Sequence, residues 1–379
     1  MSRNHSHVVG SMLRPPELLE ARERFRSGAI SATDFRAIED RAVDTAIARQ
    51  DAAGIDVITD GEQRREDFME GLLGAVSGTE EVVLAAAAGD APPVSGSDET
   101  GFWHRADPGY EPKPWIPPVV TGKIARTGSI AGEEYAYARA RASRPVKVTL
   151  PSPLVMLSYW SQEHSLGVYA SAQEMVQDFA DVLHQEIVHL ASLGCRYIQI
   201  DAPELTFLVG DGAAFGLCEM LGYTRESFLG SAIELLNGVA DAPGVTFSVH
   251  LCRGNKEGEW HSSGGYEAVS GDLFGKLDRF EYLLLEFDDE RSGDFGPLQD
   301  VPDDTCVVLG LVSTKRAAVE DHDALVRRIG DAARFHPLEQ LAISPQCGFA
   351  SILYGNPIPS DAERAKLELV GEIGHELWL

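Results

Sequence analysis

The sequence predicts an α/β protein with the architecture of a (β/α)8 TIM barrel, and two observations carry this prediction. Eight short runs rich in β-branched residues recur along the chain, and helical stretches lie between most of them. The runs are almost continuously apolar, which is typical of parallel strands that are buried on both faces. The predicted strands are residues 7–11, 56–60, 146–151, 196–205, 245–252, 282–287, 306–313 and 341–347.

Amphipathic stretches between these runs predict the helices of the barrel. Their apolar residues recur at helical spacing, which indicates one face turned toward a sheet. Strands and helices that alternate in this way favour a closed parallel barrel over an open sheet. With 379 residues the chain has the length of one barrel with an insertion, so we expect a single domain over 1–379. The main predicted helices are 32–54, 172–194, 225–239 and 320–335.

One segment interrupts the alternation between the second and third strands. Residues 72–145 are too long for an ordinary barrel connection and contain stretches rich in proline and glycine. We expect an extended hairpin or a lid here, followed by a helix at about 133–141 that leads into the third strand.

Composition excludes several classes of function. The formal net charge of −27 makes the chain a poor ligand for nucleic acids or anionic membrane surfaces, because phosphate binding needs Lys and Arg. No run of about 18 apolar residues is present, and the N-terminus lacks a signal-like apolar stretch. Five widely spaced cysteines do not form a disulfide framework. We therefore expect a cytoplasmic protein with reduced thiols, and the insertion offers a contact surface for a homo-oligomer.

Four potential metal ligands lie at predicted strand ends, where barrel enzymes place their chemistry. His250 and Cys252 end the fifth strand and point the same way, because side chains two apart share a face of a strand. Glu286 ends the sixth strand and Cys347 follows the eighth. Zinc accepts imidazole, thiolate and carboxylate ligands in a tetrahedron, so this set predicts a zinc site.

The same residues also have simpler interpretations. A cysteine at a strand end is often a small core residue, a histidine there is often hydrogen-bonded, and Glu286 has a possible ion-pair partner in Arg291. The combination is more specific than its parts. Three negative ligand charges against the two positive charges of zinc make a weak Lewis acid, which suits a bound thiol that must stay nucleophilic. Cys195, Cys218 and Cys306 are interpreted as structural.

These residues occur in an order that resembles a known family. The motifs are "DGEQRREDF" at 60–68, "QIDAPEL" at 199–205, "HLC" at 250–252, the strand-end Glu286 and "PQCG" at 345–348. Together they resemble the catalytic barrel of the cobalamin-independent methionine synthases, zinc enzymes that alkylate a thiol. The resemblance extends over nearly the whole chain.

The resemblance implies a role for each matching residue. It implies zinc ligands at His250, Cys252, Glu286 and Cys347. It also implies that Glu62 and Asp201 bind the amino group of a homocysteine-like thiol, and that Ser11 contacts its carboxylate. Charge-assisted hydrogen bonds from an ammonium group to two carboxylates fit this role. The alternative for Glu62 is a local ion pair with Arg64 or Arg65.

The chain departs from the long synthases in two ways. It has one barrel where they have two. After the seventh strand it has "GLVSTKRA", at 310–317, where the synthases have an Asp and the His that is the proposed proton donor. Ser313 and Lys315 lie here. We expect Ser313 to contact substrate and Lys315 either to protonate a leaving group or to pair with an anionic substrate; a solvated lysine is the simpler alternative.

The sequence thus predicts a zinc-dependent thiol alkyltransferase, a transferase of methionine-biosynthesis type, with Glu62, Asp201 and Lys315 as catalytic residues. Its partners would be a small thiol and an alkyl donor. Within the same chemistry, the alternative is epoxide opening as in the epoxyalkane:coenzyme M transferases, whose sulfonate-bearing thiol would need a cation such as Arg64, Arg253 or Arg291. Alternatives of other classes are a metal-free barrel enzyme like uroporphyrinogen decarboxylase and a non-catalytic zinc protein.

Overall fold

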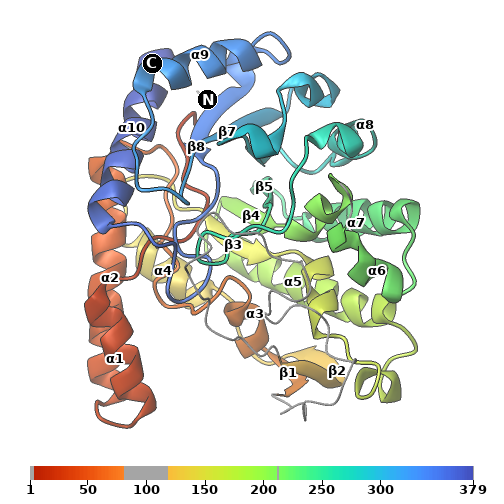
Figure 1. Ribbon diagram of the computed structural model, residues 1–379. Helices are drawn as coiled ribbons and strands as arrows, with labels where there is room; N and C mark the ends of the chain where they lie inside the picture. Colours follow the sequence, from red (N-terminus) through yellow and green to blue (C-terminus); the bar gives the residue numbers. More distant parts are fainter. Residues whose placement is uncertain (1–3, 81–117, 211–212, 379) are drawn as a thin grey trace.

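Six parallel strands form the central sheet in the computed structural model, which describes residues 4–80, 118–210 and 213–378 (Figure 1). Each strand pairs with the next one along the chain, from β3 through β8. Every residue of β3, β4, β6, β7 and β8 is buried, as expected for strands covered on both faces. The strands are β3 (Val148–Pro151), β4 (Tyr197–Asp201), β5 (Thr246–Leu251), β6 (Tyr282–Glu286), β7 (Cys306–Val312) and β8 (Leu341–Pro345).

Two short segments complete the barrel between β8 and β3. The chain near residue 6 lies beside β8, and the chain near residue 57 lies between that segment and residue 146. The predicted strands at 7–11 and 56–60 are therefore wrong in extent, because each pairs only through isolated bridges. These parallel bridges are Ser6–Ile343, His7–Val57 and Ile58–Val146.

Both short segments end early because the chain turns into the site. At Gly10 a Cβ atom would lie 2.3 Å from Oε1 of Glu62, so the first segment passes too close to this carboxylate for a larger residue. The second segment ends in a left-handed turn, with φ of 73° at Gly61 and 53° at Glu62. In both segments the chain therefore leaves the strand conformation early and turns toward the site.

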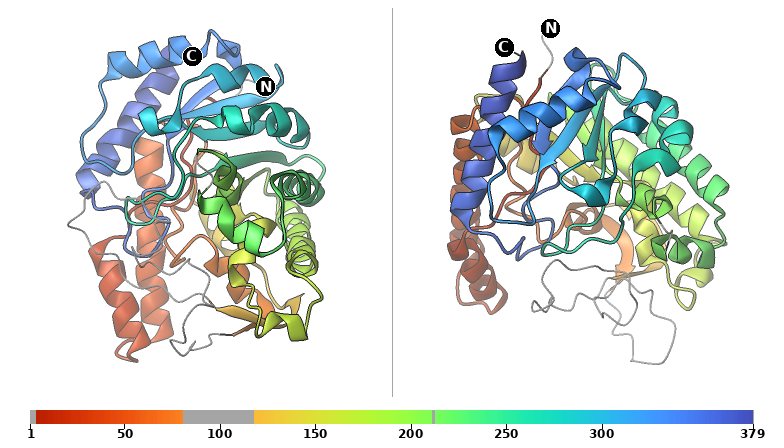
Figure 2. Two further views of the ribbon diagram at one scale, coloured as in Figure 1. Left: turned by 45° about the vertical axis from the view of Figure 1, so that its right-hand side comes forward. Right: turned by 45° about the horizontal axis from the view of Figure 1, so that its top comes forward.

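Helices surround the sheet, and the longer ones begin at residues that cap them. The side chains of Ser31, Ser171 and Thr224 accept hydrogen bonds from the first turns of α2, α5 and α7. In Figure 2 the helices surround the strands, and both termini lie at the same end of the molecule. These helices are α1 (Pro16–Arg26), α2 (Ala32–Ala52), α5 (Ala172–Ser192), α6 (Gly216–Met220), α7 (Arg225–Val239), α8 (Ser270–Leu273), α9 (His322–Ala332) and α10 (Ser360–Trp378).

The predicted insertion contains a small antiparallel hairpin, β1 (Val76–Glu80) with β2 (Val119–Arg126). Two short helices flank it, α3 (Glu70–Gly74) and α4 (Gly132–Arg139), and β2 contacts α5. The remainder of the insertion, 81–117, lies outside the described residues. In the part of the chain that is described, no helix is long and apolar enough to span a membrane.

Candidate active site

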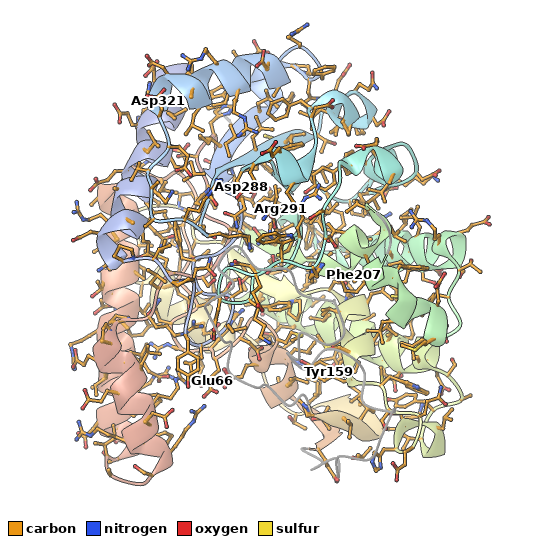
Figure 3. The ribbon with its side chains drawn as sticks, viewed as in Figure 1. Glu66, Tyr159, Phe207, Asp288, Arg291 and Asp321 are labelled. Carbon is orange, nitrogen blue, oxygen red and sulfur yellow. The ribbon has the colours of Figure 1, made fainter. Side chains whose placement is uncertain are left out.

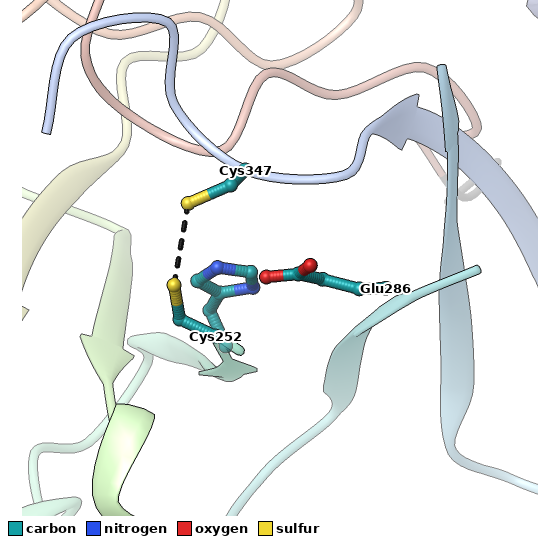
Figure 4. Close-up of side chains that lie close together, drawn as sticks. Cys252, Glu286 and Cys347 are labelled. Atoms are coloured by element: carbon teal, nitrogen blue, oxygen red, sulfur yellow. Dashed lines mark hydrogen bonds between the residues drawn. The ribbon is translucent and has the colours of Figure 1, made fainter. Parts of the chain in front are cut away.

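Four potential metal ligands meet at the carboxyl ends of β5, β6 and β8. One ligand atom from each of His250, Cys252, Glu286 and Cys347 lies within 4.8 Å of the others. Figure 4 shows Cys252, Glu286 and Cys347 approaching one another from three different segments. The Sγ atoms of the two cysteines are 3.4 Å apart. Parallel strands that end at one edge of the barrel bring these side chains together although they are far apart in the sequence.

Neighbouring hydrogen bonds orient two of these groups. Nδ1 of His250 lies 3.3 Å from the carbonyl oxygen of Leu284, which can only accept, so the ring donates there and Nε2 keeps its lone pair. Oε1 of Glu286 accepts from the backbone N–H of Arg253 at 2.8 Å. Nε2 of His250 and Oε2 of Glu286 are buried without a hydrogen-bond partner among the described residues. Buried polar atoms normally have a partner, and a metal ion between them supplies one.

The electrostatics of the cluster favour a bound cation. Burial, together with the charge of Cys347, raises the pKa of Glu286 to about 7. A hydrogen bond with Cys252 lowers the pKa of Cys347 well below its usual range, and the same bond raises that of Cys252. Burial lowers the pKa of His250, but the neighbouring Cys347 and the negative charges of Asp201 and Glu286 outweigh it and raise the value to about 9. The cluster therefore concentrates negative charge, and this charge must be balanced either by bound protons or by a metal cation.

A cavity of about 380 Å³ opens beside this cluster. Figure 3 labels two residues of its lining, Glu66 and Phe207, which lie well apart across the view. Its polar part includes Ser11, Glu62, Asp201, His250 and Cys252. Its apolar part includes Phe68, Met69, Leu154, Phe207, Leu217 and Ile352. The cavity has the size and mixed lining of a small-molecule site.

The three residues expected to bind the amino-acid part of the thiol all line this cavity. Oε1 of Glu62 accepts a hydrogen bond from Oγ1 of Thr149 at 2.8 Å. Oδ1 of Asp201 accepts from Nε2 of Gln199 at 2.6 Å. Burial raises the pKa of Asp201 to about 7, with a contribution from the charge of Glu62. Oγ of Ser11 accepts from the N–H of Ala350 at 3.2 Å.

The local ion pair considered for Glu62 does not form with either arginine. Arg64 pairs with Asp40 at 2.5 Å, and Arg65 pairs with Glu134 at 2.7 Å. Glu62 also has a left-handed backbone, with φ of 53°, which is uncommon outside glycine and concentrates at functional sites. Its carboxylate is thus held in the cavity without an arginine partner among the described residues.

A buried lysine that sequence analysis did not single out orients Asp201 through the side chain of Gln199. Nζ of Lys147 donates to Oε1 of Gln199 at 2.5 Å, and to the carbonyl oxygen of Val8 at 2.6 Å. Because the ammonium fixes the oxygen of the Gln199 amide, its Nε2 must face Asp201. Burial lowers the pKa of Lys147 to about 7. A lone lysine before a strand gives no sequence signal for this role.

The structure places Ser313 and Lys315 outside the cavity lining. Nζ of Lys315 donates to the carbonyl oxygens of Gly254 and Glu259, at 2.9 and 3.1 Å, and to Oδ1 of Asn255, at 2.9 Å. These bonds use all three protons of the ammonium group. Oγ of Ser313 lies 3.4 Å from the backbone N–H of Lys315. Lys315 therefore holds the loop after β5 in place, whereas Ser313 is bonded within the segment that follows β7.

The arginines considered for a sulfonate group are engaged elsewhere and do not line the cavity. Arg253 is fully buried, stacks on Tyr266 at 4.3 Å and donates to backbone carbonyls. Arg291 lies 2.9 Å from Asp288 and 3.7 Å from Oε2 of Glu286, so the pairing considered for Glu286 is present but is not a hydrogen bond.

Two further lining residues had no functional role in the sequence analysis. Glu204, three residues after Asp201, is 2% exposed and lines the cavity. Cys218 of α6, which was interpreted as structural, is buried in the same wall. The position of Glu204 just after the fourth strand was the available sequence signal, but spacing alone does not reveal that its carboxyl turns to the same cavity.

Comparisons with known proteins agree with this fold. Residues 5–90 and 108–358 match the family described as "Cobalamin-independent synthase, Catalytic domain". YxjH of Bacillus subtilis (strain 168) is 34% identical over 98% of this chain and 93% of its own. A 5-methyltetrahydropteroyltriglutamate–homocysteine methyltransferase of Syntrophotalea carbinolica is 24% identical over 90% of this chain, which spans 39% of that protein.

A solved structure shows the same architecture. It is described as a putative vitamin-B12 independent methionine synthase from Listeria monocytogenes, and it superimposes with a TM-score of 0.72 at 25% identity. The match covers 100% of this chain and 99% of the other. The chain therefore belongs to the cobalamin-independent methionine synthase family and is an enzyme that transfers methyl groups.

Proposed function

We propose that this enzyme methylates the sulfur of a homocysteine-like thiol at a zinc ion held by His250, Cys252, Glu286 and Cys347. The observation that carries the proposal is the convergence of these four ligand groups within 4.8 Å at the wall of a small-molecule cavity. Nε2 of His250 and Oε2 of Glu286 have no hydrogen-bond partner among the described residues and fit a metal, and two sulfurs, one nitrogen and one oxygen suit zinc. When bound, zinc would lower the pKa of the substrate thiol, so that a thiolate is available at neutral pH.

The residues of the cavity would orient the thiol. Glu62 and Asp201 would accept hydrogen bonds from its ammonium group, and Ser11 would contact its carboxylate. Gln199 and Lys147 hold the Asp201 carboxylate in one orientation, so the binding geometry exists before substrate arrives. The buried surroundings strengthen these interactions because little water competes with them.

The family match supports methyl transfer and lends no support to a decarboxylase. Epoxide opening with a sulfonate-bearing thiol receives no support from Arg64, Arg253 or Arg291, because these three arginines do not line the cavity. The methyl donor named for the relatives is 5-methyltetrahydropteroyltriglutamate, and we propose a neutral N-methyl donor of this kind here.

Calorimetric binding of two thiols to the zinc-loaded protein tests the proposal. We expect homocysteine to bind at least about tenfold more tightly than 2-mercaptoethanesulfonate, because its ammonium group pairs with two carboxylates. Glu62→Gln and Asp201→Asn should each weaken homocysteine binding by about tenfold to a hundredfold and leave the sulfonate thiol unaffected.

Glu66→Gln is a matched control. Glu66 lines the same cavity, but its carboxylate pairs with Arg22 and Arg26 and is one-third exposed, so we expect homocysteine binding to change less than twofold. Equal affinity of the wild-type protein for both thiols, or unchanged binding in both site variants, would contradict the proposed substrate.

A further inference from the structure

Glu204 is a buried acidic group in the cavity that the proposed function leaves without a role. It lies in the 3-10 helix Pro203–Leu208 that follows β4, and its side chain lines the cavity. Its Oε1 accepts a hydrogen bond from Oγ of Ser152, and that oxygen accepts in turn from the N–H of Leu154 at 3.1 Å. Oε2 of Glu204 has no hydrogen-bond partner among the described residues. One carboxyl oxygen is thus fixed, and the other is available to carry a proton.

The surroundings of Glu204 favour its protonated form up to about neutral pH. Burial raises its pKa to about 7, and the negative charge of Asp201 adds to the effect. Among the described residues, the thiol of Cys218 on α6 also interacts with Glu204; burial raises the pKa of this thiol to about 12, so it stays neutral. A carboxylic acid with a pKa close to neutrality is suited to give up a proton and to regain it from water.

Methyl transfer from a neutral amine needs such a proton. As the thiolate sulfur forms its bond to the methyl carbon, the bond from that carbon to nitrogen breaks. The electron pair of the broken bond stays on the nitrogen, which leaves as an unstable anion unless it is protonated. Lys315 lies outside the cavity lining and has three acceptors already, so it is poorly placed to supply the proton.

We propose that Glu204 is the general acid of the methyl transfer, and that its Oε2–H protonates the leaving nitrogen of a neutral N-methyl donor. The donor would lie between Glu204 and the thiolate, against the apolar wall that includes Leu154 and Phe207. After transfer Glu204 is a carboxylate, and it takes a proton from solvent once the products leave. This inference rests on the proposed function, because it assumes that a thiolate is the nucleophile.

Two methyl donors separate the acid from the nucleophile. 5-Methyltetrahydropteroyltriglutamate needs a proton on its leaving nitrogen, whereas the iodide that leaves methyl iodide needs none. With zinc-loaded enzyme and homocysteine, we expect Glu204→Gln to slow transfer from the folate donor by about a hundredfold or more. Its rate with methyl iodide should stay within about twofold of wild type, because Gln keeps the shape of the side chain and the bond from Ser152.

Each other outcome is decisive. Equal rates of Glu204→Gln and wild type with the folate donor, or equal losses with both donors, would overturn the role of Glu204. A wild-type enzyme that uses methyl iodide but not the folate donor would overturn the donor class on which the role depends. Failure of the wild-type enzyme to accelerate methylation with either donor would contradict the proposed function itself.

Infrared difference spectroscopy gives a readout without turnover. Wild type minus Glu204→Gln at about pH 6 should show the carbonyl band of a carboxylic acid, and this band should be lost at about pH 8.5. The same difference for Glu66→Gln is the control, because Glu66 lines the same cavity but is ion-paired and partly exposed. A carboxylate signal from Glu204 at about pH 6 would overturn the proposal, since a carboxylate has no proton to give.

Discussion

At the scale of single residues, the protonation state of Glu204 also has a consequence for stability. The folded protein holds the pKa of this carboxyl at about 7, whereas the unfolded chain has the ordinary value of 4.5. Below the lower value both states are protonated and there is no penalty. Between the two values the unfolded state loses its proton first, so the free energy of unfolding falls as the pH rises, and the full penalty applies above about 7.

Glu204→Gln removes this penalty. Relative to wild type, its free energy of unfolding should rise between about pH 4.5 and pH 8, by an amount on the order of 3 kcal/mol. Denaturant unfolding of both proteins at several pH values measures this difference and cancels the titration of other groups. A difference that stays constant across this pH range would show that Glu204 has an ordinary pKa.

Lys315 makes a contrasting prediction, because its ammonium group is structural in this fold. Lys315→Met leaves the acceptors at Gly254, Asn255 and Glu259 without this donor, so we expect a loss of about 2–4 kcal/mol in the free energy of unfolding. The exposed Lys276 forms only a surface pair with Asp272, and Lys276→Met should change stability by less than about 0.5 kcal/mol.

Rates measured on the same Lys315→Met protein distinguish the two roles. A variant as stable as wild type that loses methyl transfer from the folate donor alone would contradict the structural role and would restore Lys315 as the proton donor.

At the scale of elements, the strand β7 holds two ligand-bearing segments at a fixed spacing. Gly310 pairs with Glu286 on β6, and an added Cβ would lie 2.7 Å from Cα of Gln346 and 2.9 Å from the carbonyl oxygen of Leu285. Both contacts are with backbone, which cannot move aside as a flexible side chain can. Gln346 precedes Cys347, so the close approach at Gly310 sets the distance between two proposed ligands.

Gly310→Ala should therefore weaken both zinc binding and the fold. We expect a loss of about 1–3 kcal/mol in the free energy of unfolding and a zinc affinity at least about tenfold lower, measured by competition with a chelator. Gly330 is the matched control, because it lies in α9 with nothing within 4 Å of an added Cβ. Gly330→Ala should leave zinc affinity unchanged, and an equal effect of the two substitutions would contradict the spacing argument.

The elements also show what a single sequence reveals. Six of the predicted strands are present, because a continuous apolar run indicates a strand that is buried on both faces. The proposed ligands lie at the ends of these strands, as the pattern predicted. The strands at 7–11 and 56–60 are much shorter than predicted, since Gly10 and the left-handed turn at Gly61 and Glu62 divert the chain into the site. Such close approaches depend on tertiary contacts, which a local pattern does not contain.

The same limit applies to the site. Lys315 and Glu204 both follow barrel strands, and sequence position gave Lys315 the larger role. Their hydrogen bonds favour the proposed role of Glu204, because all three protons of the Lys315 ammonium are donated to the loop after β5, whereas one oxygen of Glu204 has no hydrogen-bond partner among the described residues. The hydrogen bond between Lys147 and Gln199 forms because β3 and β4 lie side by side, and a local sequence pattern does not predict this pairing.

At the scale of the whole molecule, the barrel brings together groups from β4, β5, β6 and β8 and the short segment near residue 60. Its large apolar core consists of side chains other than the four proposed ligands, so we expect the fold to persist when the metal is lost. Cys347→Ser and His250→Ala should therefore lose zinc and keep the circular dichroism spectrum of the wild type. Unfolding of both variants would indicate instead that the metal holds the barrel together.

The most direct test of the central claim is the metal content of the purified protein, combined with X-ray absorption at the zinc edge before and after addition of homocysteine. We predict about one zinc per chain, bound by two sulfurs and two lighter atoms, and one additional sulfur ligand when homocysteine is present. Folded protein that was never exposed to a chelator and yet contains no zinc, or zinc whose ligands do not change with the thiol, would contradict the claim.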